Sequence, residues 1–242
     1  KSTLIKILTG ALKRSSGEVI YNGKPWDPGS TRDAMRSGIG CLFQELNVVE
    51  QLRVEEYVCL GLEETTLGII RKRSNEKVFQ ILARIDKTIN PRQMIEELSV
   101  AKRQVVEIAK ALAMDSDVII MDEPTSPLSA EETKHLFDVV RELKANGITI
   151  IYITHRLEEV MELADYVTVL RDGKHIATRP KSEIQDRQEL IRMMIGKNIF
   201  ENYIPNTINK DHKLIEVRGM KNRKLKDITF DLYEGEILGF YG

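Results

Sequence analysis

The apolar positions of this 242-residue chain alternate between short continuous runs and the spacing of amphipathic helices. Apolar strands are predicted at residues 39–43, 117–121 and 148–153. Between the last two strands, Ser129 with Glu132 three residues later forms a capping-box pattern, and Asn146-Gly147 marks the end of the same helix. A strand, a helix and a strand at this spacing favour parallel strands joined by a right-handed crossover, so we expect an α/β fold with a mostly parallel sheet.

Residues 52–114 have a different character, because charged residues and helical spacing dominate there. Helical segments are predicted near 53–62, 75–85 and 100–113. We therefore expect a helical insert subdomain over about residues 45–113. Residues 3–12 also have helical spacing, with Lys1 and Ser2 at the N-terminal end.

The last third of the chain predicts added β structure. Residues 166–170 and 174–179 flank Asp172-Gly173, the signature of an antiparallel β hairpin. A helix at 182–196 and a linker at 197–213 follow. Strands are then predicted at 214–217, 228–232 and 236–240.

Composition excludes several classes of protein. Lys plus Arg number 36 and Asp plus Glu number 37, which gives a net charge of −1. This balance argues against a protein whose main activity is electrostatic binding of nucleic acid. Cys41 and Cys59 have no metal-ligand spacing, so a reducing compartment is the simplest interpretation. No apolar run approaches the roughly 18 to 20 residues that a membrane span needs.

The first three residues, Lys-Ser-Thr, match the end of the phosphate-binding pattern G-x-x-x-x-G-K-[ST]. In that pattern, backbone N–H groups and the helix dipole hold phosphate, and the lysine reaches the β- and γ-phosphates. The glycines do not precede Lys1 in this sequence. On these three residues alone, an ordinary charged helix start is the preferred interpretation, because the specificity of the motif lies in its glycines.

A second motif, VIIMDEP at residues 118–124, places two adjacent carboxylates at the carboxyl end of a buried strand. This is the edge at which α/β sheets bind ligands. Asp122 is a candidate ligand for Mg²⁺, directly or through water, and Glu123 can orient and deprotonate a water that attacks the γ-phosphate. The alternative is a strand that happens to end in an acidic turn.

Four further features follow a fixed order around this motif. They are Gln44 after one strand, LSVAKRQVVEIAKAL at 98–112, SPLS at 126–129, and His155 after another strand. Together with Lys1 and the Asp-Glu pair, this order resembles that of the ATP-binding cassette (ABC) ATPases. The resemblance covers nearly the entire chain and implies the fold of a P-loop NTPase.

The details resemble the sugar-import type, whose ATPase chain carries two cassettes in tandem. The support comes from ITHRLEEV, VLRDGK, and LIRMMIGKN followed by a linker and LIEVRGM. The resemblance implies a first cassette at 1–196, truncated inside its phosphate loop, a linker at 197–213, and the opening strands of a second cassette at 214–242. On this interpretation the chain is a fragment, and we expect it to be a weak or inactive ATPase by itself.

The resemblance also implies roles for the residues that contact ATP and Mg²⁺. Lys1 would neutralise the β- and γ-phosphates, Ser2 would ligate Mg²⁺, and Thr3 would bond the α-phosphate. Gln44 would sense Mg²⁺ and the attacking water, with Asp122 as a further metal ligand.

The remaining roles concern hydrolysis and the facing cassette. Glu123 would be the general base, and His155 would contact the γ-phosphate and align the water. Ser99 and the backbone N–H groups near Ala101 would close over ATP bound by the opposite cassette. Val100 and Ala101 stand where the common family pattern has Gly-Gly, and Lys102 replaces a Gln, so backbone approach to phosphate is more restricted here.

The implied function is an ATPase subunit that powers import of a monosaccharide from the cytoplasmic face of the cell membrane. Its partners would be membrane permease subunits, a second cassette and, indirectly, a sugar-binding protein, with no nucleic acid. The alternative is a soluble tandem-cassette ATPase acting on ribosomes or nucleic acid, with basic contacts at 71–73 and 221–226. A protein with an inactive site is disfavoured by the presence of Asp122, Glu123 and His155.

Overall fold

The structure is a computed structural model that describes residues 1–44, 48–61, 64–66, 69–71, 76–195, 212–222 and 226–240. The chain divides into two units, Lys1–Met194 and Ile195–Gly242. No helix in these described ranges combines the length and the apolar character needed to cross a membrane.

A parallel three-stranded sheet lies at the centre of the first unit. Its strands, in spatial order, are β3 (Ile39–Leu42), β6 (Val118–Asp122) and β7 (Thr149–Ile153). All three were predicted from apolar runs, and the predicted parallel arrangement is confirmed. The register pairs Leu42 with Met121 and Asp122 with Ile153, so the three strands end at one edge of the sheet.

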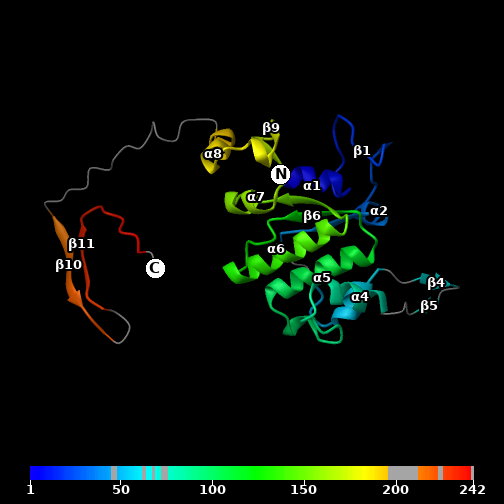
Figure 1. Ribbon diagram of the computed structural model, residues 1–242, viewed down its shortest axis with the longest axis horizontal. Coiled ribbons are helices and arrows are strands. Elements are labelled where there is room, and N and C mark those ends of the chain that lie inside the picture. Colours follow the sequence, from blue (N-terminus) through cyan, green and yellow to red (C-terminus); the bar gives the residue numbers. More distant parts are fainter. Residues whose placement is uncertain are drawn as a thin grey trace. The chain divides into compact units, whose positions relative to one another are not determined.

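Helices cover both faces of this sheet (Figure 1). The covering helices are α1 (Ser2–Leu8), α2 (Thr31–Arg36), α5 (Val100–Ala113) and α6 (Ala130–Ala145). Ile119 and Met121 of β6 belong to the core cluster that includes residues of α5 and α6, whereas Ile120 packs with Ile5 and Ala34 of α1 and α2. Burial on two faces explains why β6 is a continuous apolar run and does not alternate with polar residues.

Helix α6 begins and ends where the sequence predicts. The Ser129 side chain accepts a hydrogen bond from the Glu132 backbone, and the Glu132 side chain accepts one from the Ser129 backbone, completing the capping box. After Asn146, Gly147 adopts a φ of 83°, a left-handed conformation that glycine reaches without steric cost.

The helical insert is also present. Helices α3 (Val54–Cys59) and α4 (Glu76–Ile85) and the short 3₁₀ turn η1 (Ile95–Glu97) precede α5. Buried Val54, Val58, Leu82 and Ile108 join these helices in the same core cluster as the sheet. The turn η1 was not predicted, and neither was the two-stranded hairpin of β4 (Glu64–Thr66) and β5 (Ile69–Arg71) in the same insert.

Smaller elements complete the first unit. They are the hairpin of β1 (Ile20–Tyr21) and β2 (Lys24–Pro25), α7 (Leu157–Leu163), the hairpin of β8 (Tyr166–Arg171) and β9 (Lys174–Pro180), η2 (Lys181–Glu183) and α8 (Arg187–Ile195). The hairpin predicted around Asp172-Gly173 is confirmed. The helix predicted from residue 182 begins at Arg187, after the 3₁₀ turn η2.

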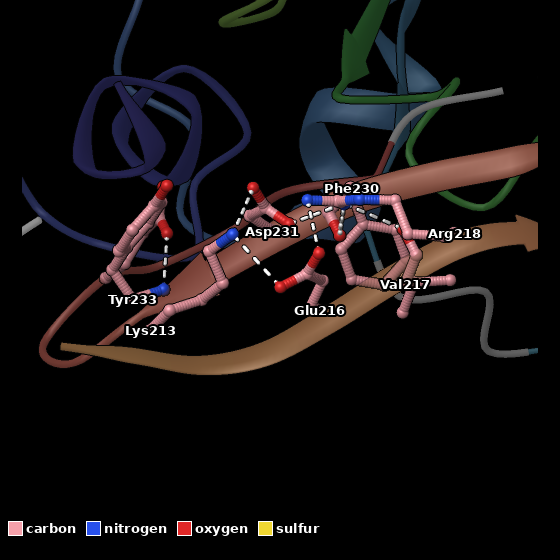
Figure 2. A network of polar contacts seen from close by, with 8 residues as sticks. Lys213, Glu216, Val217, Arg218, Phe230, Asp231 and Tyr233 are labelled. Atoms are coloured by element: carbon pink, nitrogen blue, oxygen red, sulfur yellow. Dashed lines mark hydrogen bonds and ion pairs between the residues drawn. The ribbon is translucent and has the colours of Figure 1, made fainter.

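The second unit is an antiparallel pair of strands, β10 (Lys213–Met220) and β11 (Ile228–Tyr233). Figure 2 shows a charged network across this pair, in which Lys213 and Arg218 contact Glu216 and Asp231. Hydrogen bonds from Arg218 and then Lys213 lower the pKa of Asp231 to about 2.

The strand predicted at 236–240 is wrong, because the chain turns after β11, where the Tyr233 backbone donates to the Glu236 side chain at 2.9 Å, and residues 236–240 adopt no regular structure. Most of the linker predicted at 197–213 lies outside the described residues. Lys213, its last residue, already belongs to β10.

Candidate functional site

The Asp-Glu pair and the histidine meet at the carboxyl edge of the sheet. Asp122 is the last residue of β6 and pairs in register with Ile153 of β7. The backbone N–H of Glu123 donates to the Ile153 carbonyl at 2.8 Å. The Glu123 Oε1 atom lies 3.0 Å from Nδ1 of His155. The parallel register therefore joins two residues that are 32 positions apart in the chain.

Glu123 has an unusual backbone conformation. Five non-glycine residues in the described ranges have a positive φ, and four of them are Asn22, Asp115, Asp172 and Asp227. Asn and Asp tolerate this region through local hydrogen bonds, whereas a glutamate, as at Glu123 with φ 47°, has no such compensation and bears a cost of about 1 to 2 kcal/mol. Strain of this kind persists where the surrounding structure holds it, and it is frequent at functional sites.

Lys1 lies at the same edge. Its Nζ atom donates to the carbonyl of Thr154 at 2.7 Å, directly before His155. Burial raises the pKa of Asp122, the neighbouring charge of Glu123 adds to the increase, and the positive charges of Lys1 act in the opposite direction. The structure thus brings Lys1, Asp122, Glu123 and His155 into one cluster.

Three other predicted site residues flank this cluster. Ser2 and Thr3 are exposed in the first turn of α1, next to Lys1. Gln44 is exposed just beyond β3, the strand that pairs with β6 and ends at the same sheet edge. Their positions suit the predicted contacts, and their roles remain predictions.

Ser99 and Ala101 lie elsewhere, at the start of α5. The Ser99 side chain caps this helix by accepting from the Lys102 backbone at 3.4 Å. Hydrogen bonds from Ser129, with a smaller contribution from Ser99, lower the pKa of Glu132 at the start of α6. The side chain of Ala101 is buried. The hydrogen bonds described for Ser99 therefore stay at the starts of α5 and α6 and do not reach Lys1 or His155.

Sequence reasoning missed a set of buried and half-buried polar residues that bond to the segments carrying the cluster. The Gln104 side chain on α5 donates to the Pro124 carbonyl, and the Thr125 hydroxyl donates to Glu159 on α7. Tyr152 also donates to Glu159, at 3.1 Å. These side chains can be recognised only by their burial, which the sequence does not show. From the sequence alone, a glutamate on a short charged helix is ordinarily interpreted as a solvated surface residue.

The cluster fits a divalent cation that is held together with phosphate. Mg²⁺ is usually bound through one or two carboxylates plus phosphate oxygens, without a cage made only of protein atoms. Within the described residues, no group of three or more His, Cys, Asp or Glu could hold a metal by itself. A buried carboxylate with a raised pKa, Asp122, is the kind of ligand that an added positive charge would stabilise.

Two grooves of the first unit share the lining residues Thr31, Met35 and Lys110. One of about 520 Å³ lies between α2, the end of α3 and α5, and its lining includes Arg32, Arg36, Leu60 and Lys110. A second, of about 300 Å³, shares Lys110 with the first and extends to Phe43, the residue before Gln44. The grooves therefore reach the chain segment that leads to the sheet edge.

A parallel sheet with a lysine at a helix start, an Asp-Glu pair and a histidine at its carboxyl edge defines the class of nucleotide-binding ATPase domains. A family model described as "ABC transporter" matches residues 1–126, and the chain belongs to this family. It is 41% identical, over its whole length and 48% of the relative's, to the ribose import ATP-binding protein RbsA 1 of Rubrobacter xylanophilus.

Other relatives agree with this assignment. The chain is 40% identical to a putative ribose/galactose/methyl galactoside import ATP-binding protein of Burkholderia cenocepacia, again over the whole chain and 48% of the relative. The chain spans about half the length of the curated relatives it matches.

Solved structures share the fold. The ADP-bound ATP-binding cassette of an ABC transporter superposes with a TM-score of 0.70 at 28% identity, covering 81% of this chain and 84% of that one. A nucleotide-free cassette gives 0.68 at 29% identity, covering 81% and 83%. The predicted fold class, a P-loop NTPase with a mostly parallel sheet, is thereby confirmed.

Proposed function

We propose that this chain is part of an ATP-hydrolysing subunit that powers import of a monosaccharide through an ABC transporter, at the cytoplasmic face of the cell membrane. The observation that carries the proposal is the Glu123–His155 contact at 3.0 Å, formed beside Asp122 and Lys1. The names of the relatives, which are ribose or galactose import ATP-binding proteins, supply the direction of transport and the class of cargo.

Within this site each side chain has a distinct task. Glu123 accepts the proton of the attacking water, and His155 holds the Glu123 carboxylate in place and contacts the γ-phosphate. Lys1 places positive charge against the β- and γ-phosphates, and Thr3 contacts the α-phosphate. Positioning and charge neutralisation supply most of the catalysis in phosphoryl transfer, so an array of fixed side chains suffices.

Mg²⁺, when bound with ATP, would neutralise charge on the phosphates. Ser2, Gln44 and Asp122 are its proposed ligands. Ser99 and the backbone near Ala101 serve the nucleotide held by a second cassette, since they lie at the start of α5, apart from the cluster around Lys1.

The grooves beside α2 and α5 are the proposed docking site for a cytoplasmic segment of the membrane permease. This proposal is supported by the lining of the second groove, which includes Phe43. Gln44 follows Phe43 directly in the chain, so a segment docked in the groove would be linked to the nucleotide site. Arg32, Arg36 and Lys110 line the larger groove, with Asp115 as the acidic residue among its lining side chains, so we expect the docking segment to carry acidic residues.

Cysteine cross-linking tests this docking site in membranes that contain the full-length ATPase and its permease. We expect Thr31→Cys and Leu60→Cys, which line the larger groove, to cross-link to the permease. Gln188→Cys, exposed on α8, is the control and should not. Cross-links from Gln188→Cys alone would contradict the assignment.

The Glu123→Gln variant of the full-length protein tests the activity itself. ATP binding should persist, while hydrolysis falls by about 10² to 10⁴-fold, the usual contribution of a general base. Glu183→Gln, at an exposed position of η2, is the matched control and should retain normal turnover. Turnover of Glu123→Gln near the parent rate would exclude Glu123 as the base.

Uptake assays then test the biological role. Cells that depend on this ATPase should lose accumulation of at least one labelled monosaccharide when they carry Glu123→Gln. Unchanged uptake of all monosaccharides, together with co-sedimentation of the protein with ribosomes, would instead favour the soluble alternative.

A further inference from the structure

A buried carboxylate bonds to both chain segments that carry the Glu123–His155 contact. Glu159, on α7, is only 3% exposed, although it belongs to a helix with two acidic residues in its first turn. One of its oxygens accepts a hydrogen bond from the Thr125 hydroxyl, and the other accepts one from the Tyr152 hydroxyl at 3.1 Å. Arg156, one helical turn earlier, lies 3.7 Å from Glu159.

The partners of Glu159 belong to the two segments that carry the catalytic pair. Thr125, which is 1% exposed, lies two residues after Glu123, in the turn that follows β6. Tyr152 is in β7, three residues before His155. A single side chain therefore joins the two segments whose residues Glu123 and His155 also contact each other. Burial, reinforced by the charge of Glu159, raises the pKa of Tyr152, which keeps this phenol a hydrogen-bond donor.

Simple core packing does not explain this arrangement. A carboxylate is costly to bury unless hydrogen bonds satisfy it, and an apolar side chain of similar volume would fill the space at lower cost. A carboxylate has two acceptor oxygens, which an apolar side chain lacks, and each oxygen holds one of the two segments in place. The turn it holds begins at Glu123, whose left-handed φ of 47° requires support from its surroundings.

We propose that Glu159 is a positioning residue for ATP hydrolysis: it clamps the turn after β6 to the end of β7, so that Glu123 and His155 stay in contact. This inference rests on the proposed ATPase function. Glu159 touches neither the water nor the phosphate in this role. Without it, the turn at 123–128 would sample other conformations, and the base would be out of line for most of the time.

Hydrogen exchange measures the clamp independently of activity. In nucleotide-free, full-length protein, Glu159→Ala should accelerate exchange of the amides of Glu123 and Ser126, which bond to Ile153 and Glu123 respectively. The rest of the first unit should exchange as before. Glu159→Gln, which can still accept from Thr125 and pair with Tyr152, should restore most of the protection.

Steady-state kinetics supply the second readout. In Glu159→Ala, kcat should fall by about 10- to 100-fold, the effect of a misplacement of about 1 Å, with KM for ATP changed less than about twofold. Glu159→Gln should recover most of kcat. Glu158→Ala is the matched control, because this neighbour is exposed and pairs with Arg187 at 2.7 Å on the surface. It should leave both kinetic parameters unchanged.

Thr125→Val supplies a second route if Glu159→Ala does not fold. It removes one hydroxyl partner without a change of shape, and it should reproduce the faster exchange at residues 123–128 and the loss of kcat. Exchange that stays unchanged in this turn, or that accelerates throughout the first unit, would overturn the proposal. So would a normal kcat in both Glu159→Ala and Thr125→Val. Failure of the parent protein to hydrolyse ATP would refute the proposed function, while the exchange data would still decide whether the clamp exists.

Discussion

The left-handed backbone at Glu123 leads to a prediction about stability that runs against the usual ranking of alanine and glycine. Glu123→Gly should be more stable than Glu123→Ala, because glycine occupies φ 47° without steric cost and alanine does not. Both variants lose the side-chain contact with His155, so that contact cancels in the comparison. Both should also lack ATP turnover, since neither has a carboxylate at the position of the base.

The magnitude follows from two opposing terms. A left-handed conformation costs a residue with a Cβ about 1 to 2 kcal/mol. Glycine, in return, loses about 0.5 to 1 kcal/mol more backbone entropy on folding than alanine. We therefore expect Glu123→Gly to exceed Glu123→Ala by about 0.5 to 1 kcal/mol in the free energy of unfolding.

Lys134, exposed on α6, supplies the control pair. In a helix interior, Lys134→Ala should be more stable than Lys134→Gly by about 1 kcal/mol. The glycine entropy term enters both pairs, so the difference between the two comparisons isolates the conformational strain at Glu123.

Urea unfolding followed by the fluorescence of Trp26 is the appropriate assay. Trp26 is the single tryptophan of the chain, it lies in the first unit, and its Nε1 donates to the Leu8 carbonyl at 3.2 Å. It therefore reports unfolding of the unit that contains the site, separately from the second unit. If Glu123→Ala proved as stable as Glu123→Gly while the Lys134 pair behaved as expected, the backbone of Glu123 would not be strained.

Two further predictions concern pH. Burial alone would raise the pKa of Asp86, but hydrogen bonds from Thr88 and from His135, at 3.0 Å, outweigh it and lower the pKa. Ionised Asp86 therefore stabilises the fold above the ordinary carboxyl pKa of about 4, and this stabilisation is lost as the pH falls through the lowered pKa of Asp86. When the urea concentration at the midpoint of unfolding is measured as a function of pH, its decrease toward acid pH should therefore be smaller in Asp86→Asn than in the parent protein. In an NMR titration, Asp231 should stay ionised down to about pH 2. Arg218→Ala should shift its titration upward; an unchanged value would show that this ion pair is unimportant.

Much of the fold could be predicted because its signals are local. The capping box at Ser129 and Glu132 and the turn at Asp172-Gly173 depend on residues within a few positions of one another. Continuous apolar runs predict strands, and the structure confirms the strands at β3, β6 and β7. The two-sided burial that such runs indicate is found at β3 and β6, whereas Ile151 of β7 is 38% exposed. The strand predicted at 236–240 failed, since an apolar segment forms a strand only where a partner strand accepts its hydrogen bonds, and Ile237 is almost fully exposed here.

Part of the candidate site could also be predicted from the sequence. Its residue types and their order can be identified there, from Lys1 through Gln44 and the Asp-Glu pair to His155, because each residue follows an apolar run or stands at a helix start. The contacts among these residues cannot be predicted from the sequence alone. Glu123 meets His155, and Glu159 meets Thr125, only because β6 and β7 pair in parallel with Asp122 opposite Ile153. That pairing joins two strands that are separated along the chain by helix α6, and no pattern within a few residues shows which strands will lie side by side.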